Sequence, residues 1–392
     1  MKKKKQHNIV LYLMIAIFLF GCSATLKLTF PPEAVADTEQ DWLTLGRNNL
    51  HQFYATEDVV PPLQIVWKKR IKGVVADHPL AYNNYILIPV IDGMIYQIDY
   101  KTGEEVGNGR MGFGIEHVST IYDNAIYSGF NVGHPSLLGL NLQMGEPVLR
   151  REDFQVTTTP LIWDDRMCFG TNQWVFLCIN PYSGEEIWRY EAKAPIRSSP
   201  ALQESAVIFA DEKGWVYSLD ATSGILLWEQ QLEGNTFSHP VITGSQVFIG
   251  TTTGKFYSIK IKDGKISWQK KFHGAIFSSP SVYEDKLYLG NNNHEVVCLQ
   301  QETGKVLWRF NTDGIVNTIP LPSPDYLYVT SWDKNLYVLD RESGELVFKM
   351  EFRKPLKTSP IIYKNLLFLH VANDRLYALA NASLAKNWGK QE

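Results

Sequence analysis

Few residues in this sequence have types and spacings that could support chemistry. The run Gly107-Asn108-Gly109-Arg110-Met111-Gly112 matches the dinucleotide-binding pattern G-x-G-x-x-G. That pattern binds phosphates only where it follows a strand and begins a helix, and here it falls in a loop between two repeats. The nine histidines, among them His117, His134 and His294, are scattered without the spacing of metal ligands. We therefore expect no dinucleotide site and no metal site.

Two cysteines could be chemically linked. Cys168 and Cys178 lie equally far from Gln173, the centre of an expected hairpin, so they could face each other across two strands. An exported protein could form a disulfide at this place. The alternative is that both are small buried residues, because Cys178 and Cys298 occupy a position that is held elsewhere by Ser218. Both interpretations stay open.

An internal repeat must position every one of these residues. A proline recurs about every 40 residues, and a glycine and a tryptophan recur at fixed distances from it. The marker prolines are Pro79, Pro160, Pro200, Pro240, Pro280, Pro320 and Pro360, with Ser119 in the remaining position. Turn glycines are Gly103, Gly145, Gly184, Gly224, Gly264, Gly304 and Gly344, and a tryptophan precedes several prolines by twelve residues (Trp67, Trp188, Trp228, Trp268 and Trp308). A period of this length predicts one blade of a β-propeller for each repeat.

Each repeat contains four short runs of β-branched and aromatic residues, separated by turn residues. In the fourth repeat we expect strands over 198–202, 206–210, 215–220 and 225–230. The fold class is therefore all-β, an eight-bladed propeller of four-stranded antiparallel blades, as a single domain over residues 41–392. Residues 65–71 should close the ring by pairing with the last repeat, because an open ring would leave a sheet edge unpaired. Gly107 and Leu149 stand where the first two repeats should have their tryptophan.

The motif Gly184…Trp188…Ser198-Ser199-Pro200, which recurs around Pro280, resembles the repeat of pyrroloquinoline-quinone (PQQ)-type propellers. This repeat is found in quinoprotein dehydrogenases, in extracytoplasmic sensor regions, and in BamB-type lipoproteins of the outer-membrane β-barrel assembly machinery. The resemblance to the dehydrogenases would imply PQQ held with Ca²⁺, a catalytic Asp and often adjacent cysteines. This sequence has no adjacent cysteine pair and no long insertions between blades. We therefore expect no catalytic residues and no cofactor, with a PQQ-dependent dehydrogenase as the alternative.

The residues three positions before each marker should surround one mouth of the central channel, and we call them the mouth ring. They are Ala76, Glu116, Thr157, Arg197, Phe237, Phe277, Asn317 and Lys357. Charged and aromatic side chains of this kind suit recognition of a protein or peptide. Glu116, Arg197, Phe237, Phe277 and Lys357 are thus the candidate interaction surface, and the alternative is ordinary loop variability.

The N-terminus has the order of a signal peptide. Lys2 to Lys5 precede a twelve-residue apolar stretch that is too short to cross a bilayer. Leu19-Phe20-Gly21-Cys22 resembles a bacterial lipobox, which implies lipidation of Cys22. We expect a signal peptide over 1–21, a tether over 22–40, and an extracytoplasmic protein anchored by lipid. It would face the periplasm from the outer membrane where the organism has two membranes.

A hydrophobic content of 45% and a net charge of −3 indicate a globular chain and argue against nucleic-acid binding. The resulting prediction is a non-enzymatic, membrane-tethered, monomeric propeller. It would serve as a scaffold for a protein partner, such as the outer-membrane assembly complex. A further alternative is an extracytoplasmic module that binds or senses a ligand.

Overall fold

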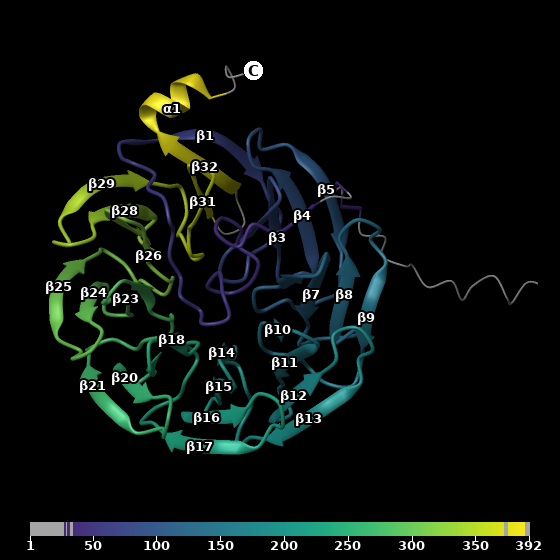
Figure 1. Ribbon diagram of the computed structural model, residues 1–392. Coiled ribbons are helices and arrows are strands. Elements are labelled where there is room, and N and C mark those ends of the chain that lie inside the picture. Colours follow the sequence, from purple (N-terminus) through teal and green to yellow (C-terminus); the bar gives the residue numbers. More distant parts are fainter. Residues whose placement is uncertain (1–26, 29, 32–33, 372–374, 389–392) are drawn as a thin grey trace, which may run out of the picture.

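The computed structural model describes residues 27–28, 30–31, 34–371 and 375–388. Within them the chain forms eight four-stranded antiparallel sheets arranged in a ring (Figure 1). The predicted eight-bladed propeller is thereby confirmed. In blades 1 to 7 the strands follow one another in sequence from the innermost to the outermost.

The first four blades run consecutively along the chain. Blade 1 has β2 (Leu80–Tyr82), β3 (Tyr85–Pro89), β4 (Met94–Asp99) and β5 (Glu105–Arg110); blade 2 has β6 (Thr120–Tyr122), β7 (Ala125–Gly129), β8 (Leu137–Asn141) and β9 (Pro147–Arg151). Blade 3 has β10 (Leu161–Trp163), β11 (Arg166–Gly170), β12 (Val175–Ile179) and β13 (Glu186–Glu191); blade 4 has β14 (Ala201–Gln203), β15 (Ala206–Ala210), β16 (Trp215–Asp220) and β17 (Leu226–Gln231).

The remaining blades complete the ring. Blade 5 has β18 (Val241–Thr243), β19 (Gln246–Gly250), β20 (Lys255–Lys260) and β21 (Ile266–Lys271); blade 6 has β22 (Ser281–Tyr283), β23 (Lys286–Gly290), β24 (Glu295–Gln300) and β25 (Val306–Asn311). Blade 7 has β26 (Leu321–Pro322), β27 (Tyr326–Thr330), β28 (Asn335–Asp340) and β29 (Leu346–Glu351); blade 8 has β30 (Ile361–Tyr363), β31 (Leu366–His370), β32 (Arg375–Asn381) and β1 (Leu63–Arg70).

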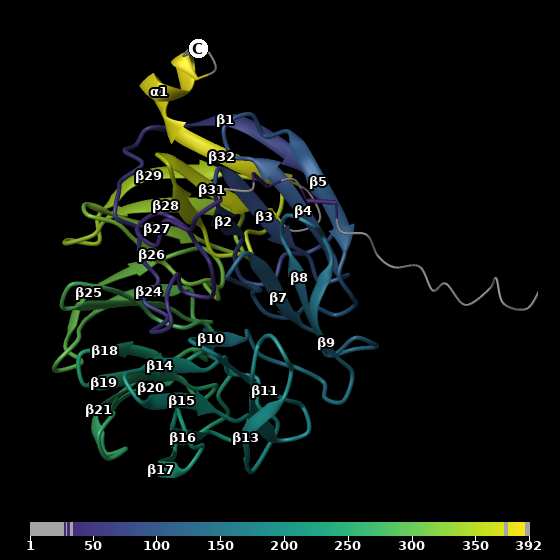
Figure 2. The same ribbon diagram turned by 45° about the vertical axis from the view of Figure 1, so that its right-hand side comes forward.

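The ring closes through a blade that both ends of the chain share. β1 pairs with β32 in antiparallel register from Leu63 opposite Asn381 to Arg70 opposite Arg375. The helix α1 (Ala382–Asn387) follows β32 and projects from the ring beside it (Figures 1 and 2). Sharing a blade leaves no gap between the first and last sheets, as the sequence predicted.

A tryptophan links each of several blades to the next one. The indole N–H of Trp188 donates to the Ala221 carbonyl at 3.1 Å, and the Gly224 turn lies against the same ring. A Cβ at Gly224 would come within 2.6 Å of that indole, so a glycine is required for this close approach. The same donor and acceptor pairing, 33 residues apart, recurs for Trp67, Trp228, Trp268 and Trp308. The regular spacing of Trp and Gly in the sequence thus encodes the docking of neighbouring blades.

Blade 1 lacks this tryptophan, and Lys27 and Leu28 lie against Gly107 in its place. Lys27 forms a β-bridge with Asn108 of β5, and a Cβ at Gly107 would come within 2.4 Å of the Lys27 carbonyl. Leu28 and Phe30 are buried in a cluster shared by blades 1 and 2. The glycine-rich run was expected in a loop, and this was wrong, because residues 107–110 belong to strand β5.

Candidate functional site

The mouth ring brings together residues from blades that are not neighbours. The Arg197 guanidinium, which precedes blade 4, lies 3.3 Å from the Glu116 carboxylate, which precedes blade 2. Arg197 also pairs with Glu212 and donates to Asn172 Oδ1 at 3.2 Å. Two residues from alternate blades can meet only near the axis of the ring, so this network spans one side of the channel mouth. It presents a fixed, partly exposed cation and carboxylate to solvent.

Two aromatic residues lie beside each other further around the mouth ring. The rings of Phe237 and Phe277 have centroids 5.8 Å apart, and Phe277 is 37% exposed. Lys357 is exposed and places its ammonium 4.1 Å from the centre of the Trp332 ring. A partly exposed aromatic pair on the same ring as fixed charges offers apolar contact area and orientation, which are the properties of a protein-binding surface.

Behind the mouth ring, the residues just before the marker prolines form a hydrogen-bonded belt around the channel. The amide of Thr159 donates to Ser199 Oγ at 3.0 Å, the amide of Ser199 to His239 Nδ1 at 2.9 Å, and the amide of His239 to Ser279 Oγ at 2.8 Å. The amide of Ile319 donates to Ser359 Oγ in the same way. The hydroxyls of the Ser-Ser-Pro motif therefore join neighbouring blades and hold the innermost strands in place.

A group of four histidines and one carboxylic acid lies in the channel. The ring of His239 is 6.2 Å from that of His51 and 5.9 Å from that of His117, and His239 Nε2 is 4.0 Å from Asp77 Oδ2. Burial lowers the pKa of His51 to about 4 and also lowers the pKa of His78. Burial, reinforced by the charge of Arg197, lowers the pKa of His117 to about 4. These imidazoles are therefore neutral at pH 7, and His51 and His78 hydrogen-bond to backbone groups.

Among the described residues, no three His, Cys, Asp or Glu side chains are arranged to hold a metal ion. The histidines are scattered along the sequence, and their meeting in the channel was not predicted. A signal was available, because His78 and His239 both stand immediately before a marker proline.

The segment of residues 41–62, which we call the lead-in, covers the opposite end of the channel. It crosses the centre of the ring in Figure 1. Trp42 is fully buried and its indole donates to the Ile362 carbonyl of blade 8 at 2.8 Å. On the far side of the ring, the Leu202 amide of blade 4 donates to the Asn49 carbonyl at 2.8 Å. One end of the channel is therefore covered by the chain itself, and the mouth ring lies at the other end.

The cysteines lie as the hairpin spacing suggested. Cys168 and Cys178 are directly opposite each other on β11 and β12, and both are fully buried. Burial, followed by the contact with Cys178, raises the pKa of the Cys168 thiol. A bond between them stays a prediction. Cys22 and the expected signal peptide lie outside the described residues.

The expected tether over 22–40 is described only in part. Its residues Leu28, Phe30 and Ala34 are buried against blades 1 and 2 rather than standing apart from the propeller. No helix in the described ranges is both long and apolar enough to cross a membrane.

Comparisons with known proteins point to one family. The family model described as "Outer membrane protein assembly factor BamB" matches residues 152–271, 212–317 and 292–392. The outer membrane protein assembly factor BamB of Burkholderia pseudomallei is 28% identical over 170 residues, which span 38% of this chain and 42% of that protein.

Solved structures show the same fold. The crystal structure of BamB from Moraxella catarrhalis matches with a TM-score of 0.66 at 19% identity, covering 81% of this chain and 99% of that one. A europium-containing methanol dehydrogenase matches with a TM-score of 0.75 at only 8% identity, covering 87% of this chain and 98% of that one. At these identities the likeness concerns the fold, which propellers of different function share.

Proposed function

Because this chain belongs to the family of the outer membrane protein assembly factor BamB, we propose that it is a non-enzymatic scaffold that binds a protein partner in outer-membrane protein assembly. The observation that carries the proposal is the mouth ring, which holds the Arg197–Glu116 ion pair and the Phe237–Phe277 aromatic pair at the end of the channel opposite the lead-in. The partner would be a component of the outer-membrane assembly complex. The propeller itself would act as a monomer.

The proposal includes the cellular location of the protein. Cys22 would carry a lipid that anchors the chain on the periplasmic side of the outer membrane. The burial of Leu28 and Phe30 supports this arrangement, because it fixes the chain at the outer edge of blades 1 and 2, only a few residues after Cys22. A lipid at Cys22 would therefore hold that edge of the ring close to the membrane.

The proposal also includes function without a cofactor. The hydroxyls of Ser199, Ser279 and Ser359 beside the channel accept from backbone amides of neighbouring blades, so these groups are committed to structure. Purified protein should lack the absorbance of a bound quinone. Stoichiometric PQQ together with alcohol or sugar oxidation would contradict this part.

Substitution of an exposed aromatic at the mouth ring tests the partner surface. Phe277→Ala should reduce co-purification of outer-membrane assembly proteins by about tenfold after gentle crosslinking, since truncation of a central anchor costs at least about 1.4 kcal/mol. The matched control is Ile225→Ala, which truncates a side chain that is 66% exposed on the outer rim of blade 4. Equal recovery with both variants would contradict the assignment of the mouth ring.

A further inference from the structure

The lead-in bonds to the same repeat position in seven of the eight blades. This position lies two residues after the marker proline. At this position a group of the lead-in hydrogen-bonds to the backbone N–H or C=O of the blade residue. The seven blade residues are Ala81, Ile121, Ile162, Leu202, Ile242, Pro322 and Ile362. Successive residues of the lead-in bond to successive blades. The Ile242 amide of blade 5 donates to the Leu50 carbonyl at 2.9 Å, and the Ala55 amide donates to the Pro322 carbonyl of blade 7 at 2.9 Å. The lead-in thus supplies backbone or side-chain hydrogen bonds to the innermost strands of these seven blades.

Blade 6 is the exception. Within the described part of the chain, no group of the lead-in bonds to the backbone of Val282, which holds this position in β22. A pocket of about 370 Å³ lies there instead. It is lined by Gln52, Tyr54, Thr56, Thr243, Val282, Tyr283 and Glu284. The innermost edge of one strand therefore faces a pocket rather than a partner.

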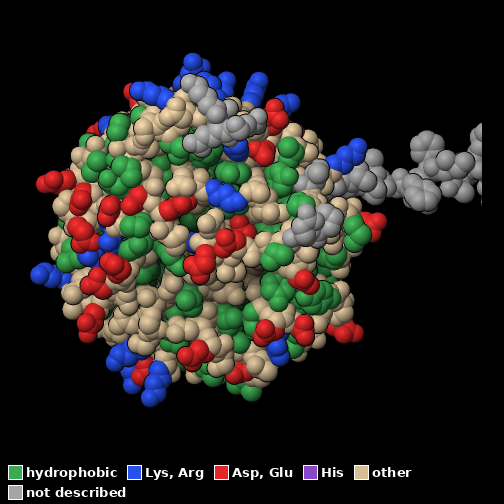
Figure 3. All heavy atoms as spheres, turned by 45° about the horizontal axis from the view of Figure 1, so that its top comes forward, with side chains coloured by type: hydrophobic (Ala, Val, Ile, Leu, Met, Phe, Trp, Pro, Cys, Tyr) green, Lys and Arg blue, Asp and Glu red, His purple; other side chains and the backbone are tan. Residues whose placement is uncertain are grey.

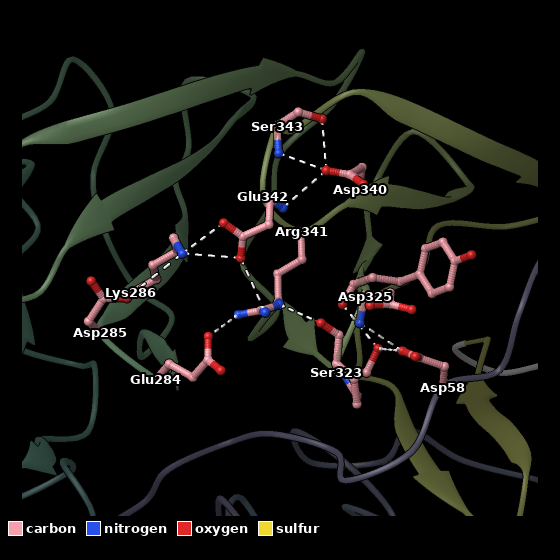
Figure 4. Close-up of polar contacts among 12 residues, drawn as sticks. Asp58, Glu284, Asp285, Lys286, Ser323, Asp325, Asp340, Arg341, Glu342 and Ser343 are labelled. Carbon is pink, nitrogen blue, oxygen red and sulfur yellow. Dashed lines mark hydrogen bonds and ion pairs between the residues drawn. The ribbon is translucent and has the colours of Figure 1, made fainter.

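The surroundings of this pocket are acidic. The Arg341 guanidinium forms ion pairs with the carboxylates of Glu284 at 3.3 Å and Glu342 at 3.1 Å (Figure 4). Asp58 and Asp325 have no cationic partner among the described residues. Asp58 instead accepts hydrogen bonds from the Ser323 hydroxyl and from the Asp325 amide. Acidic side chains also outnumber basic ones on the side of the molecule that carries β25 and β29 (Figure 3).

Aromatic side chains form the apolar part of the site. The rings of Tyr54 and Tyr283 meet edge to face with centroids 6.3 Å apart, and Arg341 lies 4.3 Å from the centre of the Tyr283 ring. Burial raises the pKa of Tyr283, and the charges of Glu284 and Asp58 raise it further against the opposing effect of Arg341. Tyr283 is thus a neutral aromatic surface, packed against Tyr54 beside an unpaired strand edge.

We propose that this pocket binds an extended, basic peptide segment of a partner, which pairs with the backbone of Val282. Such a segment would supply the hydrogen bonds that the lead-in supplies to the other seven blades, as in addition of a strand to an exposed sheet edge. Its lysine or arginine side chains would face Asp58 and Asp325. This site lies at the opposite end of the channel from the mouth ring and does not depend on the function proposed above.

Peptide binding to the full chain tests the proposal. The probe is a fluorescein-labelled hexapeptide in which lysine alternates with valine or threonine, and fluorescence anisotropy reports its binding. The matched probe has glutamate in place of lysine. We expect the basic peptide to bind and the acidic peptide to bind at least about tenfold more weakly, because like charges at the rim oppose it.

Two pairs of variants separate the backbone and charge contributions. Val282→Pro removes the amide donor, and proline suits this position because Pro322 holds it in blade 7. It should weaken the basic peptide about threefold to tenfold, whereas Val282→Ala, which keeps the amide, should not. Asp325→Lys should weaken binding more than Asp263→Lys, which makes the same change of charge on an exposed turn of blade 5.

Several results would overturn the proposal. They are failure of the basic peptide to bind, equal affinity for the two peptides, and equal affinity of the proline and alanine variants at Val282. Concentration-dependent dimers that Val282→Pro dissociates would also overturn it, because a second copy of the chain would then be the occupant.

Discussion

At the scale of single residues, the propeller depends on contacts that repeat with the sequence. The tryptophan of one blade, the turn glycine of the next and the carbonyl beside it form one unit of docking, as for Trp228, Gly264 and Ile261. Gly264 has φ +70° and its added Cβ would lie 2.6 Å from the Trp228 ring. Glycine is therefore needed there both for the backbone conformation and for the space.

Gly264→Ala should destabilise the protein by about 3 kcal/mol, because left-handed backbone costs an alanine about 1–2 kcal/mol and the clash adds a similar amount. Gly133→Ala is the matched control, since Gly133 has φ +77° but no atom within 4 Å of the added Cβ. It should cost only about 1 kcal/mol. Urea denaturation of both variants checks this, and equal losses would show that the tryptophan contact contributes nothing.

The buried histidines make stability depend on pH. His51 has a folded-state pKa of about 4 against an ordinary value of 6.5, so below pH 6.5 the unfolded chain binds a proton that the folded chain does not. Its contribution is fully present above pH 6.5 and is lost as the pH falls toward 4. Burial raises the pKa of Asp41 to about 6. Between pH 6 and 3.8 the folded chain therefore binds a proton that the unfolded chain does not, so this carboxyl increases the free energy of unfolding as the pH falls.

His51→Asn should therefore flatten the loss of stability on acidification. Between pH 6.5 and 5 the free energy of unfolding of the unmodified protein should fall more than that of the variant, by a difference on the order of 2 kcal/mol. Asparagine suits the site because His51 has φ +59° and asparagine tolerates this conformation. Chemical denaturation at several pH values measures the difference, and parallel curves would contradict the role given to His51.

At the scale of elements, segments outside the repeat replace interactions that the repeat lacks. Lys27 and Leu28 lie where blade 1 has Gly107 in place of a tryptophan, and Leu28, Phe30 and Ala34 are buried between blades 1 and 2. Tyr82 of blade 1 donates to the Ala34 carbonyl, and Gln143 of blade 2 donates to the Pro31 carbonyl. The segment thus acts as a substitute for the missing interblade contact.

Phe30→Ala should destabilise the protein by about 3 kcal/mol, because Phe30 is 7% exposed and a truncated buried phenylalanine leaves a cavity. Hydrogen exchange should become faster in β5 and β6 before other blades respond. Val35→Ala is the control, since Val35 is 80% exposed and should change stability by less than about 0.5 kcal/mol. A uniform change in exchange across all blades would argue against a local role for the segment.

The periodic parts of the fold were predictable, and the aperiodic parts were not. Strands predicted in the fourth repeat over 206–210 and 215–220 coincide with β15 and β16, because strand, turn and glycine positions recur in every blade. The lead-in and residues 27–34 have no repeat to indicate their partners, so their contacts with distant blades follow only from the closed ring. The pairing of Arg197 with Glu116 was missed for the same reason, since alternate blades meet only across the axis.

At the scale of the whole molecule, the two ends of the channel differ in what they can bind. One end is covered by the lead-in, with an acidic pocket at blade 6, and the other carries the mouth ring. A scaffold with two unlike ends could contact two partners at once without changing its shape. The ring, linked at six of its eight interfaces by a tryptophan or by the belt of hydroxyls, keeps both surfaces at a fixed separation.

Photo-crosslinking in intact cells tests the account most directly. A photoreactive phenylalanine analogue at position 277 should crosslink to a protein of the outer-membrane assembly complex, whereas the same analogue at position 225 on the outer rim should not. Crosslinks from position 225 but not from position 277, or none to that complex from either position, would contradict the assignment of the mouth ring as the partner surface.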